Sequence, residues 1–478
     1  MKKIQLFMSA LLLCGLSVFT SCSDSDDSPA PVQENERAVF EKQFSQDVQD
    51  MADEFRFDAL SQTASSINEF IDALDEDALA AKLGDLVVGI VGGLQSTKMA
   101  DLPAGDKVAV TDCLKDRLGI TDEEVANMES FVVVDAYNSI GKMKMAFKDG
   151  QCTITNDADA FTIENTNSEG QTKTIALKFN DERDGLCFFI NVYGNPIAIQ
   201  LPKSITVTKT TTQGKIFTGT IFLTTFDANQ SKYVSFKRHG WMAEGTLSAD
   251  INNRRESANL YTRHTAAGAF DLKAAFVING KEMASMEVDD MHDTYTDEEI
   301  EEFKELRDMG EFFSASYDVL KALKGKSVDN ITITMNNNMV IKGKVNDIAK
   351  SLLALGNVRK LYGTKPGKEA IDKYTQELNN YVHFTVGQKN TGITADATLV
   401  TAQKNLTNGE YQPVVALKFN GEKEALAMFD RMTDKDKENY KKMFDNFKPL
   451  VTEISETLIV ARKKGEAIVT AFKNYFAN

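Results

Sequence analysis

The segment FDLKAAFVINGKEMASMEV, residues 270–288, decides the fold class of this chain. Its centre is the pair Asn279-Gly280, and both residues tolerate the positive φ angles that a type I′ turn demands. From Met143 to Val288, apolar residues recur with a period of two, and Thr, Val, Ile and Phe are enriched. Further turns are expected at Asp149-Gly150 and Gln213-Gly214. This part of the chain therefore predicts a series of antiparallel β-strands.

The apolar residues that precede this stretch follow a helical period. From Arg37 to about Leu94 they recur at intervals of three and four, which is the spacing of one face of an α-helix. We therefore expect amphipathic helices here. The residues that carry the pattern are Phe40, Phe44, Val48, Met51 and Phe55, followed by Ile67, Phe70, Ile71 and Leu74.

Two further helices are indicated by paired capping residues at their starts. Thr121 is followed three residues later by Glu124, and Thr296 by Glu299. In such a pair the threonine oxygen and the carboxylate each accept from a backbone N–H that has no partner within the helix. Thr433 starts a similar segment.

The C-terminal part repeats this combination of strands and helices. Residues 330–345 predict a hairpin that turns at Asn336–Asn338, and residues 381–420 predict strands. Helices are expected over 347–381, broken near Gly363 and Pro366, over 433–447, and again after Pro449. The predicted fold class is α+β, with antiparallel β-meanders and packed amphipathic helices.

A repeated sequence segment suggests an internal duplication. Ala-Leu-Lys-Phe-Asn occurs at residues 176–180 and again at 416–420, and the flanks also align. Residues 142–147 match 381–386, and 154–164 match 393–403. The alternative is that unrelated antiparallel meanders converge on the same alternation of apolar and polar residues.

The N-terminus has the pattern of an export signal. Lys2 and Lys3 precede an apolar run, Ile4 to Val18, that is too short for a comfortable permanent membrane span, which is typical of a signal peptide. The following Phe19-Thr20-Ser21-Cys22 resembles the lipobox of bacterial lipoproteins, although Phe19 stands where Leu is usual. The resemblance implies cleavage before Cys22 and a lipid on its thiol. The alternative is an ordinary secretory signal followed by an unmodified cysteine.

An acidic, flexible segment follows the cysteine. Residues 23–27 are Ser-Asp-Ser-Asp-Asp, and residues 28–31 are Ser-Pro-Ala-Pro, with too little apolar content to order the chain. This cluster resembles the surface-export signal of Bacteroidetes-type lipoproteins, which implies the outer face of the outer membrane. A solvated spacer without routing information, on a periplasm-facing protein, is the alternative.

These observations divide the chain into four parts. We expect a signal peptide at 1–21, a lipidated cysteine and tether at 22–35, an N-terminal lobe of helices and β-meander at 36–290, and a related second lobe at 291–478. The length exceeds what one hydrophobic core usually serves, which also favours two domains.

Charge and hydropathy limit the possible partners. The chain has 54 basic and 70 acidic residues, a formal net charge of −16, and cleavage of the signal removes two of the lysines. Such a balance repels nucleic acid and anionic lipid headgroups. The longest later apolar run, Leu86 to Leu94, is short and interrupted by glycines. The lipid on Cys22 is therefore expected to be the anchor.

Three cysteines remain in the mature body. Cys113, Cys152 and Cys187 cannot all pair with one another, and their spacing matches no metal knuckle or CxxC motif. Cys187 lies in an apolar run, where a buried thiol behaves as a small hydrophobe. Inert packing is expected, and a disulfide among the three stays open.

The sequence contains no assembled catalytic motif. It has no Gly-x-Ser-x-Gly, His-Glu-x-x-His or phosphate-binding Gly-x-x-x-x-Gly-Lys pattern. His239 stands near the only tryptophan, Trp241, where an aromatic and cationic ligand contact competes with a solvated strand edge. His264 and His383 alternate with apolar neighbours on expected strands, and a sheet histidine with satisfied hydrogen bonds is favoured for both.

The densest set of possible metal ligands precedes Thr296. Asp290, His292 and Asp293, together with Asp289, could hold a divalent cation, but near neighbours in sequence rarely converge on one ion without a defined loop. A solvated acidic loop before a helix N-terminus is favoured, because the positive end of the helix dipole attracts such charges. We therefore expect neither a metal nor a cofactor.

These inferences favour a surface-tethered, non-enzymatic lipoprotein. It would act as a binding or scaffold module in the cell envelope, with an envelope or extracellular partner that the sequence does not identify. With 29 Phe and a single Trp, the aromatic residues indicate core packing rather than sugar stacking. The alternatives are a hydrolase whose carboxylates are scattered in sequence, and a carrier of apolar ligands.

Overall fold

The computed structural model divides into two compact units that interleave along the chain. The first unit contains residues up to 57 and residues 281–451, and the second contains 58–280 and 452–478. The segment from the signal peptide to the tether, including Cys22, and the expected Thr296 helix lie outside the described residues. The structure describes residues 36–72, 76–77, 80–81, 96–135, 141–148, 151–156, 159–179, 185–192, 195–210, 216–225, 231–235, 239–251, 254–265, 269–293, 326–348, 350–351, 354, 357, 367–403, 411–428 and 432–477.

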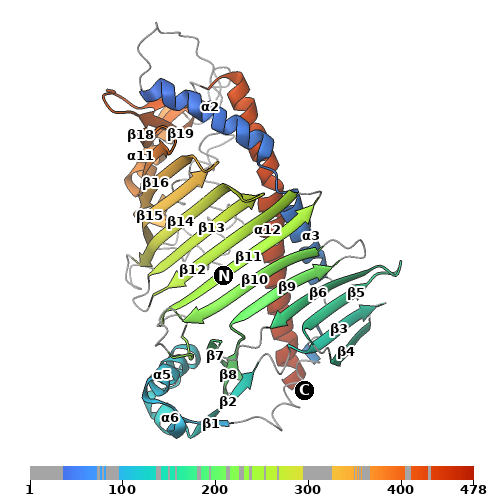
Figure 1. The fold of residues 1–478 in the computed structure, drawn as a ribbon. Coiled ribbons are helices and arrows are strands. Elements are labelled where there is room, and N and C mark those ends of the chain that lie inside the picture. The colour runs from blue at the N-terminus through green and yellow to red at the C-terminus, as the bar shows by residue number, and fades with distance from the viewer. Residues whose placement is uncertain are drawn as a thin grey trace. The chain divides into compact units, whose positions relative to one another are not determined.

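A long sheet dominates the second unit (Figure 1). Its strand order is β4-β3-β5-β6-β9-β10-β11-β12-β13, and neighbours are antiparallel except for the parallel pair β3 and β5. The strands are β3 (Met143–Lys148), β4 (Gln151–Asn156), β5 (Phe161–Thr166), β6 (Thr172–Phe179), β9 (Ser204–Thr210), β10 (Ile216–Thr225), β11 (Trp241–Ile251), β12 (Arg254–His264) and β13 (Phe270–Ile278). The predicted change to a period of two is thus confirmed.

The second unit also holds a small sheet with its own core. Its order is β1-β2-β8-β7, and β2 pairs with β8 in parallel. In this core the ring of Phe131 makes T-shaped contacts with the rings of Phe189 and Tyr233, and Val110 and Leu114 belong to the same buried cluster. The elements are β1 (Ser96–Lys98), η1 (Met99–Asp101), α5 (Ala104–Leu118), α6 (Asp122–Ala126), β2 (Ser130–Asp135), β7 (Cys187–Val192) and β8 (Asn195–Gln200), and the unit begins with α3 (Asp58–Asp72).

The first unit contains an antiparallel meander. Its strands follow one another in chain order from β14 to β20. One row across neighbouring strands is entirely apolar and buried, and it consists of Met286, Ile333, Ile341, Val386 and Ala395. The elements are α2 (Glu36–Glu54), β14 (Lys281–Asp293), β15 (Lys326–Met335), β16 (Met339–Val345), α11 (Lys368–Tyr381), β17 (Val382–Gln388), β18 (Thr394–Gln403), β19 (Tyr411–Lys418) and β20 (Leu426–Ala427).

The two turns predicted from asparagine and glycine have the expected backbone. Asn279 and Gly280 have φ angles of 49° and 83°, the pair of positive values that a type I′ turn requires. Asn336 and Asn337 have φ angles of 51° and 53° between β15 and β16. Asparagine tolerates this region better than other residues with a Cβ, which explains its use at both turns.

Helix starts were predicted better than helix ends. Thr121 and Glu124 form the expected reciprocal capping box at α6. Thr433 caps α12 (Asp434–Ala477), where its hydroxyl accepts from the Asp436 N–H. The expected break near Pro449 is wrong, because α12 continues through it. A proline inside a helix costs about 3 kcal/mol, but burial of the adjacent Leu450 provides packing that offsets this cost.

The fold is thus mixed α/β, with helices and a large mixed sheet, and strands dominate. The repeated segment lies at the ends of β6 and β19. Ala176 of β6 pairs with Thr162, and Ala416 of β19 pairs with Thr398. The preceding strands differ, because β3 is parallel to β5 whereas β17 is antiparallel to β18. The aligned segments also differ, because residues 154–164 include parts of β4 and β5 whereas residues 393–403 contain the single strand β18. The aligned residues therefore do not have the same strand partners in the two copies.

Candidate functional site

One face of the long sheet in the second unit is rich in hydroxyl side chains. Register places Thr206, Thr220, Thr246 and Asn259 in one row across β9, β10, β11 and β12, because residues that pair directly point to the same face. We call this surface the hydroxyl face, and it consists of Thr206, Thr220, Thr246, Ser248, Ser257 and Asn259.

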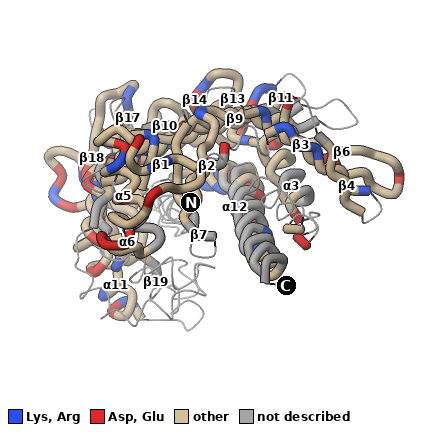
Figure 2. Tube along the Cα trace, turned by 90° about the horizontal axis from the view of Figure 1, so that it is seen from below, with Lys and Arg blue, Asp and Glu red and all other residues tan. Residues whose placement is uncertain are grey.

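The opposite face of the same sheet is occupied by helices. Glu256 on β12 points to this side and accepts a hydrogen bond from the backbone N–H of Leu60 in α3, with an N···O distance of 2.9 Å. Figures 1 and 2 show α3 and the C-terminal part of α12 on one side of these strands. Thr246 and Asn259, in contrast, are exposed. The face that carries Glu256 is therefore largely covered, although Leu260 on the same face is exposed, and the opposite face presents Thr246 and Asn259 to solvent.

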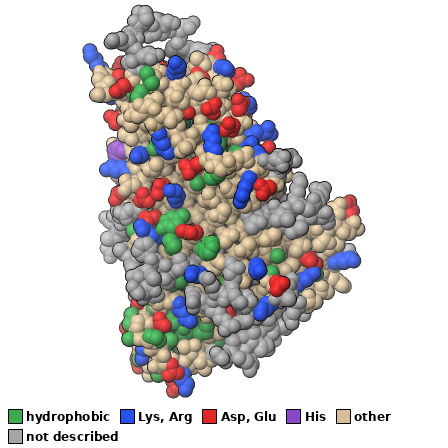
Figure 3. All heavy atoms as spheres, viewed as in Figure 1, with side chains coloured by type: hydrophobic (Ala, Val, Ile, Leu, Met, Phe, Trp, Pro, Cys, Tyr) green, Lys and Arg blue, Asp and Glu red, His purple; other side chains and the backbone are tan. Residues whose placement is uncertain are grey.

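Charges of both signs border the hydroxyl face. Arg263 and Asp271 form an ion pair across β12 and β13, and Lys144 pairs with Glu164 at 2.8 Å between β3 and β5. Figure 3 shows blue and red side chains scattered around a tan centre. The exposed Phe222 lies at one end of this face, directly opposite Glu244. The six residues of the hydroxyl face are therefore uncharged, while Lys178, which pairs with Thr206, and Glu244 adjoin it with opposite signs.

His239 is held by two partners that use both ring nitrogens. Its Nδ1 accepts from the Ser235 N–H at 2.9 Å, so the neutral ring carries its proton on Nε2, which lies 3.4 Å from Asp112 Oδ2. A general base needs an available nitrogen within reach of a nucleophile. This histidine instead joins the 231–235 segment to α5, and its geometry favours a structural role.

Trp241 has ring contacts within the sheet. Its ring stacks on His264, with centroids 5.9 Å apart and an interplanar angle of 14°, and it meets the edge of Phe270 at 6.5 Å. His264 Nδ1 also lies 3.1 Å from the His239 carbonyl oxygen. His383 is exposed on β17, 3.4 Å from Asn346 Nδ2. Both sheet histidines thus have polar contacts, as expected.

The acidic cluster before residue 296 lies on a strand, and the expected loop is therefore wrong. Asp289, Asp290, His292 and Asp293 all belong to β14, where His292 pairs with Ser327 and Asp293 with Lys326. The side chains of Asp290, His292 and Asp293 lie outside those described. Among the described residues, no three His, Cys, Asp or Glu side chains gather in a way that could hold a metal ion. Pairing with β15 explains the error, because acidic composition alone does not reveal a partner strand.

Cys113, Cys152 and Cys187 form no disulfide with one another. Cys113 and Cys187 are buried in the core of the small sheet. Burial raises the pKa of the Cys187 thiol to about 12, so that thiol stays protonated and unreactive. Cys152 is partly buried on β4.

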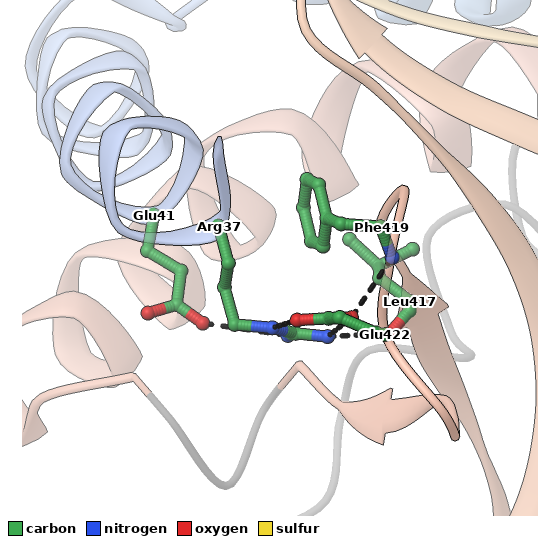
Figure 4. Close-up of polar contacts among 5 residues, drawn as sticks. All are labelled: Arg37, Glu41, Leu417, Phe419 and Glu422. Carbon is green, nitrogen blue, oxygen red and sulfur yellow. Dashed lines mark hydrogen bonds and ion pairs between the residues drawn. The ribbon is translucent and has the colours of Figure 1, made fainter. Parts of the chain in front are cut away.

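In the first unit, the start of α2 is fixed by an arginine (Figure 4). Arg37 donates from Nε to Glu422 Oε1 at 2.6 Å, and from Nη2 to Glu422 Oε2 and the Leu417 carbonyl oxygen, both at 2.7 Å. Its guanidinium lies 4.7 Å from the centre of the Phe419 ring. Burial alone would lower the pKa of Arg37, but the bond and charge of Glu422 raise it above its ordinary value. The site is an anchor for α2, which follows directly on the expected tether.

Sequence reasoning missed both the hydroxyl face and this anchor. The alternation of threonines along 204–210 and 216–225 was a usable signal for the face, since alternate residues of a strand share a side. No local pattern signals a bond between residues 385 positions apart. Within the described residues, no helix combines the length and apolar content needed to cross a membrane. Comparison with models of known families, with curated proteins and with solved structures found no match.

Proposed function

We propose that this chain is a surface-tethered, non-enzymatic binding module of the cell envelope, and that it presents the hydroxyl face to its partner. The observation that carries this proposal is the asymmetry of the sheet in the second unit. One face is covered by helices, while the other displays a row of hydroxyl and amide groups with Thr246 and Asn259 exposed.

The chemistry of that face indicates the kind of partner. Hydroxyl and amide groups both donate and accept hydrogen bonds, and they match polar, uncharged groups on an opposing surface. The centre offers no cluster of basic side chains for a polyanion. The paired charges at its margins would contribute to orientation rather than to affinity. The partner is therefore a neutral, polar surface in the envelope or outside the cell.

The partner can be sought by pull-down from native envelopes, with a matched pair of variants. Thr246→Lys places a charge in the middle of the hydroxyl face, and capture of the partner should fall by at least about tenfold, or about 1.4 kcal/mol. Thr385→Lys on β17 is the control, because Thr385 is also an exposed strand threonine but belongs to the first unit. Equal capture by both variants would remove the hydroxyl face from the proposal.

The tether part of the proposal rests on the lipobox resemblance. Lipid on Cys22 would hold the body at the membrane, and the acidic residues behind it favour the outer face of the outer membrane. Cys22→Ala should release the protein from the membrane fraction, and its retention there would contradict lipidation. Protease added to intact cells should digest the body. Survival of the body until the outer membrane is opened would place the protein on the periplasmic side.

The architecture of the two halves forms part of the same proposal. We infer that α+β meanders with packed amphipathic helices arose by duplication, and that the pairs β5–β6 and β18–β19 preserve the common element. The shared segment Ala-Leu-Lys-Phe supports this idea.

A further inference from the structure

An exposed carboxylate next to the hydroxyl face has an aromatic neighbour on each adjacent strand. Register places Glu244 of β11 between Phe222 of β10 and Tyr261 of β12. Glu244 is exposed, Phe222 is 46% exposed, and Tyr261 is half-buried. Residues that pair directly across antiparallel strands have Cβ atoms about 5 Å apart. The two aromatic residues therefore flank the carboxylate at one strand spacing on either side.

The other neighbours of Glu244 on this side of the sheet carry no charge. Met242 and Thr246 lie two residues away along β11 and share its face. The nearest basic side chain in the register is Arg263, which lies diagonally across β12 and pairs with Asp271. Among the described residues, the Glu244 carboxylate has no hydrogen bond or ion pair of its own. Its charge is therefore available to a ligand.

A carboxylate framed by two aromatic rings and a thioether suits an organic cation. The face of an aromatic ring attracts a positive charge within about 6 Å of its centre. A cation bound to Glu244 lies at about that distance from both flanking positions, because each is one strand away. A metal ion would instead need several more oxygen ligands than Glu244 supplies. The surroundings of Glu244 therefore select for a cation that also has an apolar surface.

We propose that Glu244, Phe222, Tyr261 and Met242 form a slot that receives an arginine side chain of the partner protein. We call these four residues the arginine slot. A guanidinium group is planar, donates two parallel hydrogen bonds to a carboxylate and stacks on aromatic rings, whereas a lysine ammonium does neither. The inference rests on the proposed function, because the arginine belongs to the otherwise neutral surface that meets the hydroxyl face.

Two observations favour a protein side chain over a small free cation. Small ligands bind in concave sites that bury most of their surface, whereas Glu244 and Phe222 are exposed on a strand face. The slot also adjoins the exposed Thr246 and Asn259, which can bond to further groups of the same partner. The net charge of −16 attracts a basic group from a distance. Lys273, which pairs with Tyr261, disfavours a second cation beside the first.

The slot can be tested on the purified full-length protein with a defined probe. The methyl groups of methionine are labelled with ¹³C, and Met242→Leu identifies the signal of Met242. The probe is acetyl-Gly-Arg-Gly-amide, and its matched control is the citrulline peptide, which has the same shape without the charge. The Met242 signal should shift with the arginine peptide alone. In Glu244→Gln the dissociation constant should rise by at least about tenfold.

The aromatic contribution has its own matched variants. Phe222→Leu keeps an apolar side chain but removes the ring, and binding of the arginine peptide should weaken about threefold. Phe222→Tyr keeps the ring and should bind like the unmodified protein. Leu260→Ala is the control, because Leu260 is 41% exposed but lies on the opposite face of the same sheet, and it should leave binding unchanged. Circular dichroism of each variant checks that the fold is retained.

Four results would overturn the inference. These are an equal shift with the citrulline peptide, equal affinity for a lysine peptide, tighter binding of tetramethylammonium, and unchanged binding by Glu244→Gln. The contact with the partner is tested separately by pull-down from native envelopes, where Glu244→Gln should reduce capture. Unchanged capture would exclude this slot from the partner interface even if the peptide binds.

Failure of the proposed function gives a different pattern of results. If the hydroxyl face does not meet the partner, Thr246→Lys captures the partner normally, although the arginine peptide still shifts the Met242 signal. If the arginine slot is wrong but the hydroxyl face is right, Thr246→Lys reduces capture, whereas the peptide does not bind and Glu244→Gln captures normally.

Discussion

Helices α2 and α3 are attached to their sheets in opposite ways. In the first unit the helix supplies the side chain, because Arg37 of α2 reaches Glu422 and the Leu417 carbonyl oxygen. In the second unit the sheet supplies the side chain, because Glu256 of β12 accepts from the backbone N–H of Leu60 at the start of α3. The Arg37 contact thus depends on the identity of a side chain of α2, whereas α3 contributes to its contact a backbone group that almost any residue would provide.

A second difference is the surroundings of the buried carboxylate in each unit. Asp47 of α2 is bound by amides, with Asn338 Nδ2 at 2.6 Å, Gln43 Nε2 at 3.2 Å and Asn336 Nδ2 at 3.4 Å. Glu256 has, besides Leu60, the Arg254 Nε at 3.1 Å. Burial raises the pKa of both carboxyl groups, and the hydrogen bonds oppose it. At both carboxyl groups, therefore, the hydrogen bonds compensate only part of the cost of removing the charge from water.

The largest expected effect is loss of the arginine anchor. Arg37→Ala leaves Glu422 and the Leu417 carbonyl oxygen without their donor and should destabilise the docking of α2 by about 2–4 kcal/mol. Hydrogen exchange of the α2 amides measures this directly, because local opening can be resolved in a protein of two units. Arg37→Lys keeps the charge but loses the two parallel bonds, so its effect should be intermediate. Unchanged protection of α2 in the alanine variant would refute the anchor.

The second effect concerns the attachment of α3. Glu256→Ala removes the acceptor from the Leu60 N–H and the partner of Arg254, and α3 should lose about 1–3 kcal/mol of protection. Glu256→Gln keeps one acceptor oxygen and should lose less. Exchange at the first turn of α3 gives the measurement, and α2 serves as an internal control because it belongs to the other unit. Equal loss of protection in α2 and α3 would mean that the Glu256 contact stabilises the whole protein rather than α3.

The third effect is on the pH dependence of stability. Its sign is opposite to that expected for carboxylates in salt bridges. A carboxyl group whose pKa is raised on folding binds its proton more tightly in the folded state. Stability from Asp47 and Glu256 is therefore complete below the unfolded pKa of about 4 and is lost as pH rises through the folded values. Asp47→Asn should flatten this fall for α2, and Glu256→Gln for α3. The measurement is hydrogen exchange between pH 5 and 8, corrected for the intrinsic exchange rate. If burial does not control these groups, the slope of protection against pH should be the same in each variant as in the unmodified protein.

The smallest expected effect is at the cap that adjoins α2. Asp436 accepts from the Thr433 hydroxyl and also from the hydroxyl of Ser45 in α2. Thr433→Ala removes the N-cap and should cost about 1 kcal/mol in the first turn of α12. Thr121→Ala at the exposed α6 is the matched variant. Because α6 has only five residues, its effect should stay local, and any loss of protection in α2 should follow Thr433→Ala alone.

Sequence reasoning succeeded where the cause was local. The asparagine turns and the Thr121 and Thr433 caps depend on bonds within a few residues, and all of them were found. It failed at Pro449, where burial of Leu450 supports a helix that propensity disfavours, and at Asp289–Asp293, where a partner strand overrides an acidic composition. His239 could not be assigned, because Ser235 and Asp112 become its partners only in the fold.

The amino-acid sequence by itself determined the strand period, the asparagine turns and the helix starts at Thr121 and Thr433, because each depends on residues that are close neighbours in the chain. Only the tertiary structure decided which face of the long sheet is open, that Arg37 meets Glu422, and that Asp47 and Glu256 are buried. These properties depend on contacts across hundreds of residues, and their free energies arise from burial and geometry that no local pattern encodes.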